Sequence, residues 1–524
     1  MTNTSADAVV TRTLLQRNAL RGPDEIYLDF GEHGTWTRRG ALDQAAAAAN
    51  TLCALGVSHG DRVTLMLDNG PDFLRALWGT AVLGAIAVPI NTAFHGAALR
   101  HVLTLAHPRC VVTDSRRRDR FTDVGQIHTA VVDAADLRGG DRTLPQQAAV
   151  DNTDVALLML TSGTTGVSKL SCTTYLQTYL GGSYLLGDKG FGPDDVALID
   201  LPMFHLAIGY KLSACLATGT RMAIREAPDL ERYWEVARDC DANLNVLLGS
   251  MMSYLLSRPA GRADRQHALR LTMVAPAPRM VLDYQRRFGV REVMTGYGST
   301  ELPVPLALTS GDDITTGTSG RPRPGFHAKI VDAHGVEVPD GAVGELLIRG
   351  ESPGMISPGY FANPDATAAS RIGDWIRIGD LFYREPGGSY FYVDRAKDAL
   401  RRRGENISSM EVESIVTELA GVADAACVPV DLPEGLEQEV KVWVVAHPGA
   451  ALSAESVFLH CVEHMPYFMV PRFVEFTDHL PKTHTQRTQK YQLRQRGNGP
   501  VTWDREAAGY RVSRRGVTQH GRAL

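Results

Sequence analysis

Residues 62–90 read RVTLMLDNGPDFLRALWGTAVLGAIAVPI. This stretch contains two apolar runs, at 62–67 and 85–90, and an amphipathic segment between them at 71–84. Short apolar runs joined by a longer amphipathic segment are typical of buried parallel strands connected by a helix. We therefore predict a strand, a helix and a strand in these ranges, which together form a βαβ unit.

The same alternation continues along the first 300 residues or so. It recurs in VALIDLPMF, LERYWEVARDC, NLNVLLGS and MVLDYQRRFGVREVM. Repeated strand and helix patterns of this kind predict an α/β protein whose sheets are mainly parallel.

The character of the sequence changes twice in the second half of the chain. Residues 320–350 are rich in turn residues and short apolar runs, which predicts a β-rich subdomain. After Arg395, Ser408 and Glu411 have the spacing of a capping box, and apolar residues from Val412 onward fall on one helical face. We predict a large N-terminal domain over 1–394, a small mobile α+β domain over 395–497, and a polar tail over 498–524.

The composition limits the classes of protein. A chain of 524 residues is too long for one hydrophobic core, so at least two domains are expected. Its 44% hydrophobic and 22% charged residues are those of a folded globular protein. A net charge of -5 provides no basic field for a nucleic-acid backbone, so we expect no nucleic-acid partner.

No segment predicts a leader or a membrane span. The N-terminal residues MTNTSADAVVTRTLLQRN lack the apolar region of a secretory signal, which predicts a cytoplasmic protein. The most apolar long stretch, 76–90, is shorter than the ~20 residues that cross a bilayer. The seven cysteines form no CxxC pair and predict neither a disulfide framework nor a zinc site.

The first of three glycine-rich segments is LTSGTTGVSK at 160–169. Its glycines let the backbone approach an anion, its hydroxyls and amides can donate hydrogen bonds, and Lys169 adds a positive charge. The spacing differs from that of a P-loop. Taken alone, the segment is either a phosphate-binding loop or an ordinary surface loop.

The second segment is TGYGSTE at 295–301. An aromatic between glycines could stack on a base, and the carboxylate of Glu301 could hold Mg²⁺ beside phosphates. The alternative is a turn that ends a strand.

The third segment begins with GDL at 379–381 and continues with YVDRAKD at 392–398 and RGEN at 403–406. Asp380 could accept hydrogen bonds from both ribose hydroxyls, and Arg395 could bridge ribose and phosphate. The alternative is a surface hairpin with solvated charges. Three such segments in this order in one chain favour a nucleotide site.

Together these segments resemble the signature motifs of the ANL superfamily of adenylating enzymes, which includes acyl-CoA synthetases. The resemblance extends over nearly the whole chain, and the sequence is similar to that of the crotonobetaine/carnitine-CoA ligase type. Further matching phrases are LPMFH at 201–205, GRPRPG at 320–325, GELLIRG at 344–350, GYFANPDATA at 359–368, GDWIRIGDL at 373–381 and MPYFMVPRFVEF at 465–476.

The resemblance implies a role for each of the following residues. The phosphate loop would comprise Thr161, Ser162, Gly163, Thr164, Thr165, Gly166 and the catalytic Lys169. Gly296 and Tyr297 would face adenine beside Ala275 and Pro276, Thr300 would touch the α-phosphate, and Glu301 would bind Mg²⁺. Asp380 would hold the ribose, Arg395 would contact ribose or phosphate, Lys397 would be the hinge, and His205 would line the acid pocket.

The chain departs from the family pattern in its C-terminal motif. The family sequence Pro-Lys-Thr-x-x-Gly-Lys is PKTHTQR here, at 481–487. The family's catalytic lysine is therefore aligned with Arg487.

The leading hypothesis is an AMP-forming ligase that adenylates a small acid with ATP and Mg²⁺, releases pyrophosphate and transfers the acyl group to CoA. One alternative in the same fold is an enzyme that uses a non-standard acid or a non-CoA acceptor, such as an ATP-dependent diazotase activating nitrite for an aryl amine. A third is a non-catalytic nucleotide-binding relative.

Overall fold

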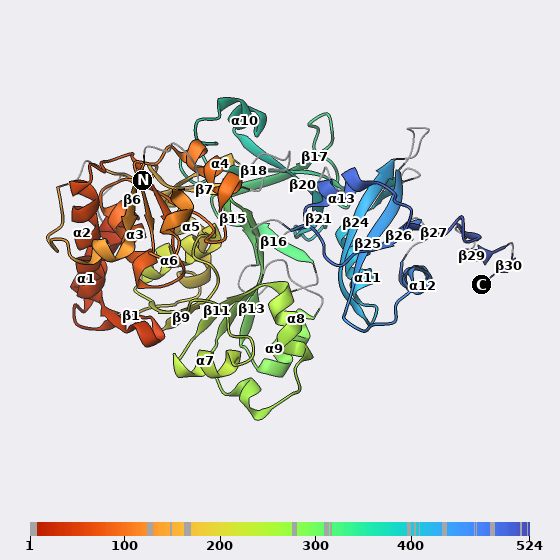
Figure 1. Cartoon of the computed structure of the whole chain (residues 1–524), viewed down its shortest axis with the longest axis horizontal. Coiled ribbons are helices and arrows are strands. Elements are labelled where there is room, and N and C mark those ends of the chain that lie inside the picture. The colour runs from red at the N-terminus through yellow and green to blue at the C-terminus, as the bar shows by residue number, and fades with distance from the viewer. Residues whose placement is uncertain are drawn as a thin grey trace. The chain divides into compact units, whose positions relative to one another are not determined.

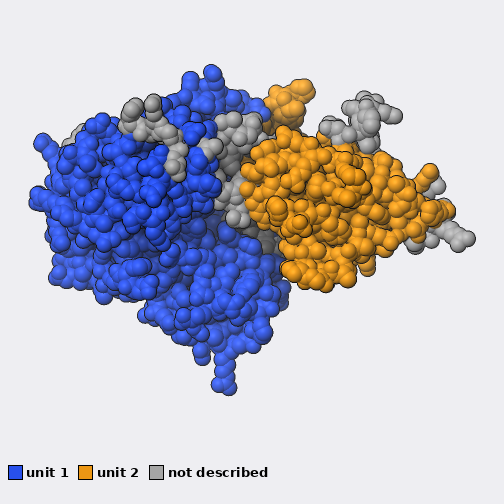
Figure 2. Space-filling model, viewed as in Figure 1, with its two compact units in different colours: residues 1–329, 347–377, 385–391 blue, residues 330–346, 378–384, 392–524 orange. Residues whose placement is uncertain are grey.

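The computed structural model describes most of the chain. The described residues are 8–122, 129–146, 149–161, 169–274, 280–308, 314, 317–395, 400–402, 405–407, 409–431, 438–465, 467, 469–482, 488–513, 516–520 and 522–523. They divide into two compact units, shown in Figure 2: unit 1 is 1–329, 347–377 and 385–391, and unit 2 is 330–346, 378–384 and 392–524.

The βαβ unit predicted from 62–90 is present in unit 1. Strand β3 (Arg62–Met66), helix α3 (Pro71–Val82) and strand β4 (Ile86–Pro89) follow one another, and β3 pairs with β4 in parallel. Their sheet has the order β6-β5-β3-β4-β7-β8. The remaining strands are β5 (Cys110–Thr113), β6 (Ala130–Asp133), β7 (Val155–Thr161) and β8 (Lys169–Thr174).

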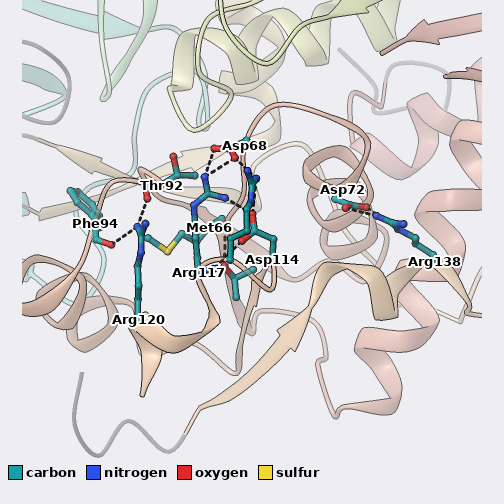
Figure 3. Close-up of polar contacts among 11 residues, drawn as sticks. Met66, Asp68, Asp72, Thr92, Phe94, Asp114, Arg117, Arg120 and Arg138 are labelled. Atoms are coloured by element: carbon teal, nitrogen blue, oxygen red, sulfur yellow. Dashed lines mark hydrogen bonds and ion pairs between the residues drawn. The ribbon is translucent and has the colours of Figure 1, made fainter. Parts of the chain in front are cut away.

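The carboxyl ends of β3, β4 and β5 are joined by arginine contacts (Figure 3). Arg117 donates to both oxygens of Asp68, at 2.8 and 2.6 Å, and also forms an ion pair with Asp114. Arg120 donates to the carbonyl oxygens of Thr92, at 2.6 Å, and Phe94, at 3.3 Å. These contacts hold the segment after β5 against the ends of β3, which pairs with β5, and of β4, the next strand in the sheet.

A second sheet of unit 1 has the order β13-β12-β11-β9-β10-β1-β2 and is parallel except at β2. Its strands are β1 (Ile26–Asp29), β2 (Thr35–Thr37), β9 (Val196–Ile199), β10 (Arg221–Ile224), β11 (Leu244–Leu247), β12 (Leu271–Val274) and β13 (Glu292–Met294). The mainly parallel sheets confirm the predicted α/β class.

Helices pack around these sheets (Figure 1). Helices α1 (Thr11–Arg21), α2 (Arg38–Ala54) and α3 contact one another, as do α5 (Tyr175–Leu186) and α6 (Leu206–Thr218). The others are α4 (Gly96–Ala106), α7 (Tyr233–Asp239), α8 (Gly249–Ser257), α9 (Val281–Phe288) and α10 (Pro364–Ala369). No helix of the described residues is both long and apolar enough to cross a membrane.

The predicted β-rich region consists of antiparallel strands. In unit 1, β14 (Gly296–Ser299) pairs with β15 (Leu302–Ala307), β15 with β16 (Thr318–Pro322), and β16 with the start of β21 (Tyr390–Arg395). Short β19 (Arg371–Ile372) pairs with the first residues of β20 (Trp375–Arg384). The remaining strands are β17 (Phe326–Val331) and β18 (Gly344–Gly350).

Unit 2 is an α+β body built on the sheet β24-β25-β26-β27. Its strands are β22 (Leu400–Arg402), β23 (Glu405–Ile407), β24 (Val422–Asp431), β25 (Gln438–Ala446), β26 (Phe473–Phe476), β27 (Trp503–Asp504), β28 (Tyr510–Ser513), β29 (Gly516–Gln519) and β30 (Arg522–Ala523). Its helices are α11 (Ser409–Thr417), α12 (Ala454–His464) and α13 (Lys490–Arg496). Tyr510, Val512 and Val517 belong to its core, so the segment after 497 packs as part of this unit.

Helices α5 and α6 approach each other closely at two glycines of α5. A Cβ atom on Gly182 would lie 2.2 Å from the carbonyl oxygen of Tyr210 and 2.7 Å from the Cβ of Ala214, and a Cβ on Gly181 would lie 2.2 Å from Tyr210 Cγ. Backbone atoms cannot yield as a flexible side chain does, so this contact requires glycine.

We expect Gly182→Ala to lower the melting temperature, because overpacking a close helix contact costs about 1–3 kcal/mol. The matched control is Gly249→Ala in α8, where an added Cβ meets nothing within 4 Å. That change should be neutral or stabilising, since alanine is the better helix former. Equal melting temperatures for the two variants would contradict the close packing of α5 and α6.

Candidate functional site

The phosphate-loop segment is the connection of a β-hairpin. Thr161 ends β7, Lys169 begins β8, and the two residues are paired across the antiparallel ladder. The hydroxyl of Thr161 donates to the carbonyl oxygen of Lys169 at 3.4 Å. Both ends of the loop are thus fixed by the sheet. Its interior lies outside the described residues, including Ser162, Gly163, Thr164, Thr165 and Gly166.

The other side of β8 pairs with a segment almost 200 residues later. Ser171 forms an antiparallel bridge with Tyr360, the N–H of Cys172 donates to Gly359 at 2.9 Å, and the N–H of Phe361 donates to Leu170 at 2.8 Å. This pairing places the Nζ of Lys169 5.0 Å from the centre of the Tyr360 ring. A cation over an aromatic face is attracted by the negative face of the ring.

The second motif forms the tight hairpin of β14 and β15. A Cβ on Gly296 would lie 2.8 Å from the carbonyl oxygen of Leu306 and from Val304 Cγ1, so glycine permits the close approach of β15. The register shifts between Tyr297 and Ser299, as at a β-bulge, which changes the direction of the following side chains. Tyr297 is 8% exposed and pairs with Leu306.

The carboxylate of Glu301 is held by two hydroxyls at the end of this hairpin. Ser299 donates to Oε2 at 2.9 Å, and Tyr360 donates to Oε1 at 2.9 Å. The N–H of Ser357 donates to the backbone carbonyl of Glu301 at 3.0 Å, and the Nε2 of Gln177 donates to that of Thr300 at 3.3 Å. Lys169 and Glu301 therefore both contact the side chain of Tyr360, although they come from two distant motifs.

The surroundings of Glu301 fit a magnesium ion. The side chain is largely buried, and each carboxylate oxygen accepts one of the two hydrogen bonds while a carboxylate offers about four acceptor positions. Proteins commonly hold Mg²⁺ with one or two carboxylates and the phosphates of the substrate. Glu301 is the residue that would bind the ion here.

The predicted ribose-binding residues lie together in unit 2. The Nε of Arg395 is 2.6 Å from the Oδ1 of Asp380, and Nη1 donates to the carbonyl oxygen of Ile378 at 3.3 Å. The Asp380 side chain is 3% exposed and that of Arg395 is 22% exposed. The arginine therefore holds the buried carboxylate of Asp380 through its Oδ1 atom.

A buried ionic cluster lies next to this pair along the chain. The Oδ2 of Asp394 accepts a hydrogen bond of 2.7 Å from the N–H of Ser409 and another from its hydroxyl. Lys490 donates to that hydroxyl and lies 2.8 Å from the Oε1 of Glu413, which also accepts a hydrogen bond from the N–H of Cys427. Burial opposes the charge of Lys490, but the carboxylates of Glu413 and Asp394 outweigh burial and raise the pKa of Lys490.

Of the remaining predicted residues, the structure describes His205. His205 is half-buried immediately before α6, with its ring 4.7 Å from that of Phe204. Four residues lie outside the described residues: Ala275, Pro276, Lys397 and Arg487.

The two ends of the segment that carries Arg487 are described. Lys482 and Thr488 form a β-bridge, and the N–H of Gln489 donates to Pro481 at 2.7 Å. Lys482 also forms a 2.6 Å ion pair with Asp424. These contacts hold the two described ends of the segment together.

The sequence does not predict several residues that contact the candidate residues within each unit. Tyr360 lies in the matching phrase at 359–368 and Ser299 inside the second motif, but neither pattern predicts a contact with Glu301. Gln177, Ser409 and Glu413 carry no motif that would single them out. Their functions depend on contacts across the fold, which sequence spacing does not contain.

Comparison with known proteins identifies the family. The model of the AMP-binding enzyme family matches residues 15–361, and that of the AMP-binding enzyme C-terminal domain matches 411–487. The chain therefore belongs to the AMP-binding enzymes, which confirms the resemblance to the ANL superfamily and the prediction of an AMP-forming ligase.

Individual proteins that are similar to this chain are known by sequence and by structure. The chain is 30% identical over 460 residues to the crotonobetaine/carnitine–CoA ligase of Proteus mirabilis, covering 83% of this chain and 88% of that protein. The enzyme of that name from Salmonella typhimurium is 29% identical over the same shares. ATP-bound MatB from Rhodopseudomonas palustris has a TM-score of 0.82 at 24% identity, covering 93% of this chain and 99% of that one. A benzoate CoA ligase from Burkholderia xenovorans LB400 has a TM-score of 0.81 at 25% identity, covering 92% and 99%.

We expect Lys490→Met to lower the free energy of unfolding by about 3–5 kcal/mol, because removing one partner leaves buried carboxylates without a cation. The double variant Lys490→Met/Glu413→Gln should recover part of this loss. The control is Arg286→Met. Arg286 and its partner Asp283 are both largely exposed, so this variant should lose no more than about 1 kcal/mol of the free energy of unfolding. Urea unfolding measures all three, and a Lys490→Met loss equal to that of the control would contradict a stabilising cluster.

Proposed function

We propose that this AMP-forming ligase uses ATP and Mg²⁺ to adenylate the carboxylate of a small organic acid and then transfers the acyl group to CoA. The observation that carries the proposal is the convergence of Lys169 and Glu301 on the side chain of Tyr360 in unit 1. A cation and a carboxylate that could hold Mg²⁺ thus contact the same side chain, and Thr300 directly precedes that carboxylate in the chain. Phosphoryl and nucleotidyl transfer depend on such positioned charges.

In the first half-reaction, a carboxylate oxygen of the acid attacks the α-phosphorus of ATP, and the bond to the bridging oxygen of pyrophosphate breaks. Lys169 would draw the β- and γ-phosphates by charge, and the Thr300 hydroxyl would donate to the α-phosphate. When bound, Mg²⁺ neutralises charge on the phosphate oxygens. Asp380 would accept the ribose hydroxyls while Arg395 keeps its carboxylate in place. Lys397 is the proposed hinge for the change to the second half-reaction.

In the second half-reaction, the thiol sulfur of CoA attacks the acyl carbon, a thioester forms and AMP leaves. The choice of a small acid is supported by the relatives, whose names specify crotonobetaine, carnitine and benzoate. His205, at the start of α6, is the proposed contact in the acid pocket.

The decisive experiment measures pyrophosphate release across a panel of small carboxylic acids, with and without CoA. We expect release with a subset of acids and formation of the matching thioester when CoA is added. Nitrite, with and without an aryl amine, tests the diazotase alternative in the same assay. No AMP or pyrophosphate with any member of the panel would favour the non-catalytic alternative.

We expect Glu301→Gln to reduce adenylation severely, because an amide oxygen is a poorer ligand for Mg²⁺ than a carboxylate. The amide oxygen can accept from one of the two hydroxyls, and the amide NH2 can donate to the oxygen of the other, so the fold should be retained. Pyrophosphate release and the melting temperature are measured together. Unchanged release in the folded variant would contradict the role of Glu301.

A second candidate function rests on Arg487, which stands where the family has its catalytic lysine. A guanidinium keeps the charge but is planar and bulkier than an ammonium. If Arg487 performs the usual task, Arg487→Ala should slow adenylation by about 10²–10³-fold, and Arg487→Lys should retain or raise carboxylate activation.

The opposite pattern would favour a differently shaped anion such as nitrite. Arg487→Lys should then impair the native reaction without giving good turnover of carboxylates. Half-reaction rates of both variants distinguish these outcomes. If Arg487→Ala leaves both rates unchanged, the position takes no part in the chemistry.

A further inference from the structure

Tyr360 connects the two charged groups of the candidate phosphate site. Its hydroxyl donates to the Oε1 of Glu301 at 2.9 Å, while the face of its ring lies 5.0 Å from the Nζ of Lys169. These two groups belong to separate motifs, and Tyr360 belongs to neither. One side chain thus contacts both the proposed metal ligand and the proposed phosphate-binding cation.

The backbone of Tyr360 is fixed from two directions. It is bridged to Ser171 of β8, and its N–H donates to the hydroxyl of Thr367 at 2.9 Å. The N–H of Asn363 donates to its carbonyl oxygen at 3.2 Å. A side chain on so constrained a backbone provides a fixed reference for the groups that it touches.

The carboxylate of Glu301 is held from both of its oxygens. Ser299 donates to Oε2 from within the same hairpin. Tyr360 donates to Oε1 from a position 59 residues further along the chain. Two donors on different oxygens determine how the carboxylate plane is turned. Each donor uses only part of the acceptor capacity of its oxygen, so the group remains able to bind a cation.

We propose that Tyr360 is a positioning residue that orients Glu301 toward Mg²⁺ with its hydroxyl and aligns Lys169 toward phosphate with its ring. The inference rests on the proposed function of this site. The hydroxyl and the ring act on different ligands, so the two effects can be separated by substitution.

Two substitutions divide the contacts. Tyr360→Phe keeps the ring under Lys169 and removes the donor to Glu301. Tyr360→Leu removes both. The matched control is Tyr254→Phe, because the hydroxyl of Tyr254 also donates to a carboxylate, that of Glu231, on the exposed surface of unit 1.

The first measurement is the affinity for Mn²⁺ in the presence of ATP. Electron paramagnetic resonance detects the bound Mn²⁺ and does not depend on turnover. We expect Tyr360→Phe to weaken Mn²⁺ binding by about 10-fold or more, the scale of a hydrogen bond to a charged group. ATP affinity without metal should change little in Tyr360→Phe and fall clearly in Tyr360→Leu. Tyr254→Phe should match the parent protein in both.

The second measurement is the Mg²⁺ dependence of pyrophosphate release. In Tyr360→Phe, the Mg²⁺ concentration for half-maximal rate should rise by about the same factor, while kcat at saturating Mg²⁺ stays close to that of the parent. A merely structural role would lower the melting temperature and kcat without this selective shift. Melting temperatures of all variants provide the check on folding.

The outcomes separate this inference from the proposed function. Mn²⁺ affinity within twofold of the parent in folded Tyr360→Phe overturns the positioning role, even if the parent releases pyrophosphate normally. A selective loss of Mn²⁺ affinity supports the role, even if no acid of the panel is turned over. A parent protein that binds no Mn²⁺ with ATP overturns both.

Discussion

The backbone pairing of β8 with the segment at 357–361 is the constraint on which the candidate site depends. The bridge between Ser171 and Tyr360 and its flanking hydrogen bonds join chain segments almost 200 residues apart. Because side chains alternate along a strand, a slip of one residue would turn Tyr360 to the opposite face. Both the ring contact with Lys169 and the hydrogen bond to Glu301 would then be lost. The pairing therefore determines the position of groups from three separate segments.

The same constraint explains how the buried carboxylate of Glu301 obtains its hydrogen-bond donors. Burying a charge without partners is costly, so Glu301 requires donors. Ser299 supplies a local one, and Tyr360 supplies one that exists only when the distant segment is paired correctly. The hydroxyls are neutral, so they donate hydrogen bonds to the carboxylate and leave its charge in place. A lysine or arginine partner would instead cancel that charge. Asp380 is different, because Arg395 forms an ion pair with it and leaves less negative charge for a metal.

The sequence predicts those parts of the molecule that local patterns determine. Apolar runs at 62–67 and 85–90 with an amphipathic segment between them predict β3, α3 and β4, since each period follows from local geometry. The motifs containing Lys169, Glu301 and Asp380 are recognisable because glycines and charges cluster within a few residues. Tyr360 is not predicted from spacing, because its roles come from contacts 59 and 191 positions away with Glu301 and Lys169. The cluster of Asp394, Ser409, Glu413 and Lys490 is hidden for the same reason.

That cluster also bears on the proposed hinge at Lys397. Asp394 precedes the hinge, whereas Ser409 and Lys490 follow it, so a rotation about Lys397 would separate Asp394 from both partners. Lys490 would keep Glu413, because both lie beyond the hinge. The rotation would thus replace the two hydrogen bonds that Asp394 accepts with contacts to water. The buried ammonium of Lys490 would keep a carboxylate partner. Since water replaces most of what is lost, the net difference between the two arrangements is limited to a few kcal/mol, about 1.5–3 for each hydrogen bond to a charged group. A difference of that size can be overcome by the differential binding of ligands, which is what a cycle between adenylation and transfer requires.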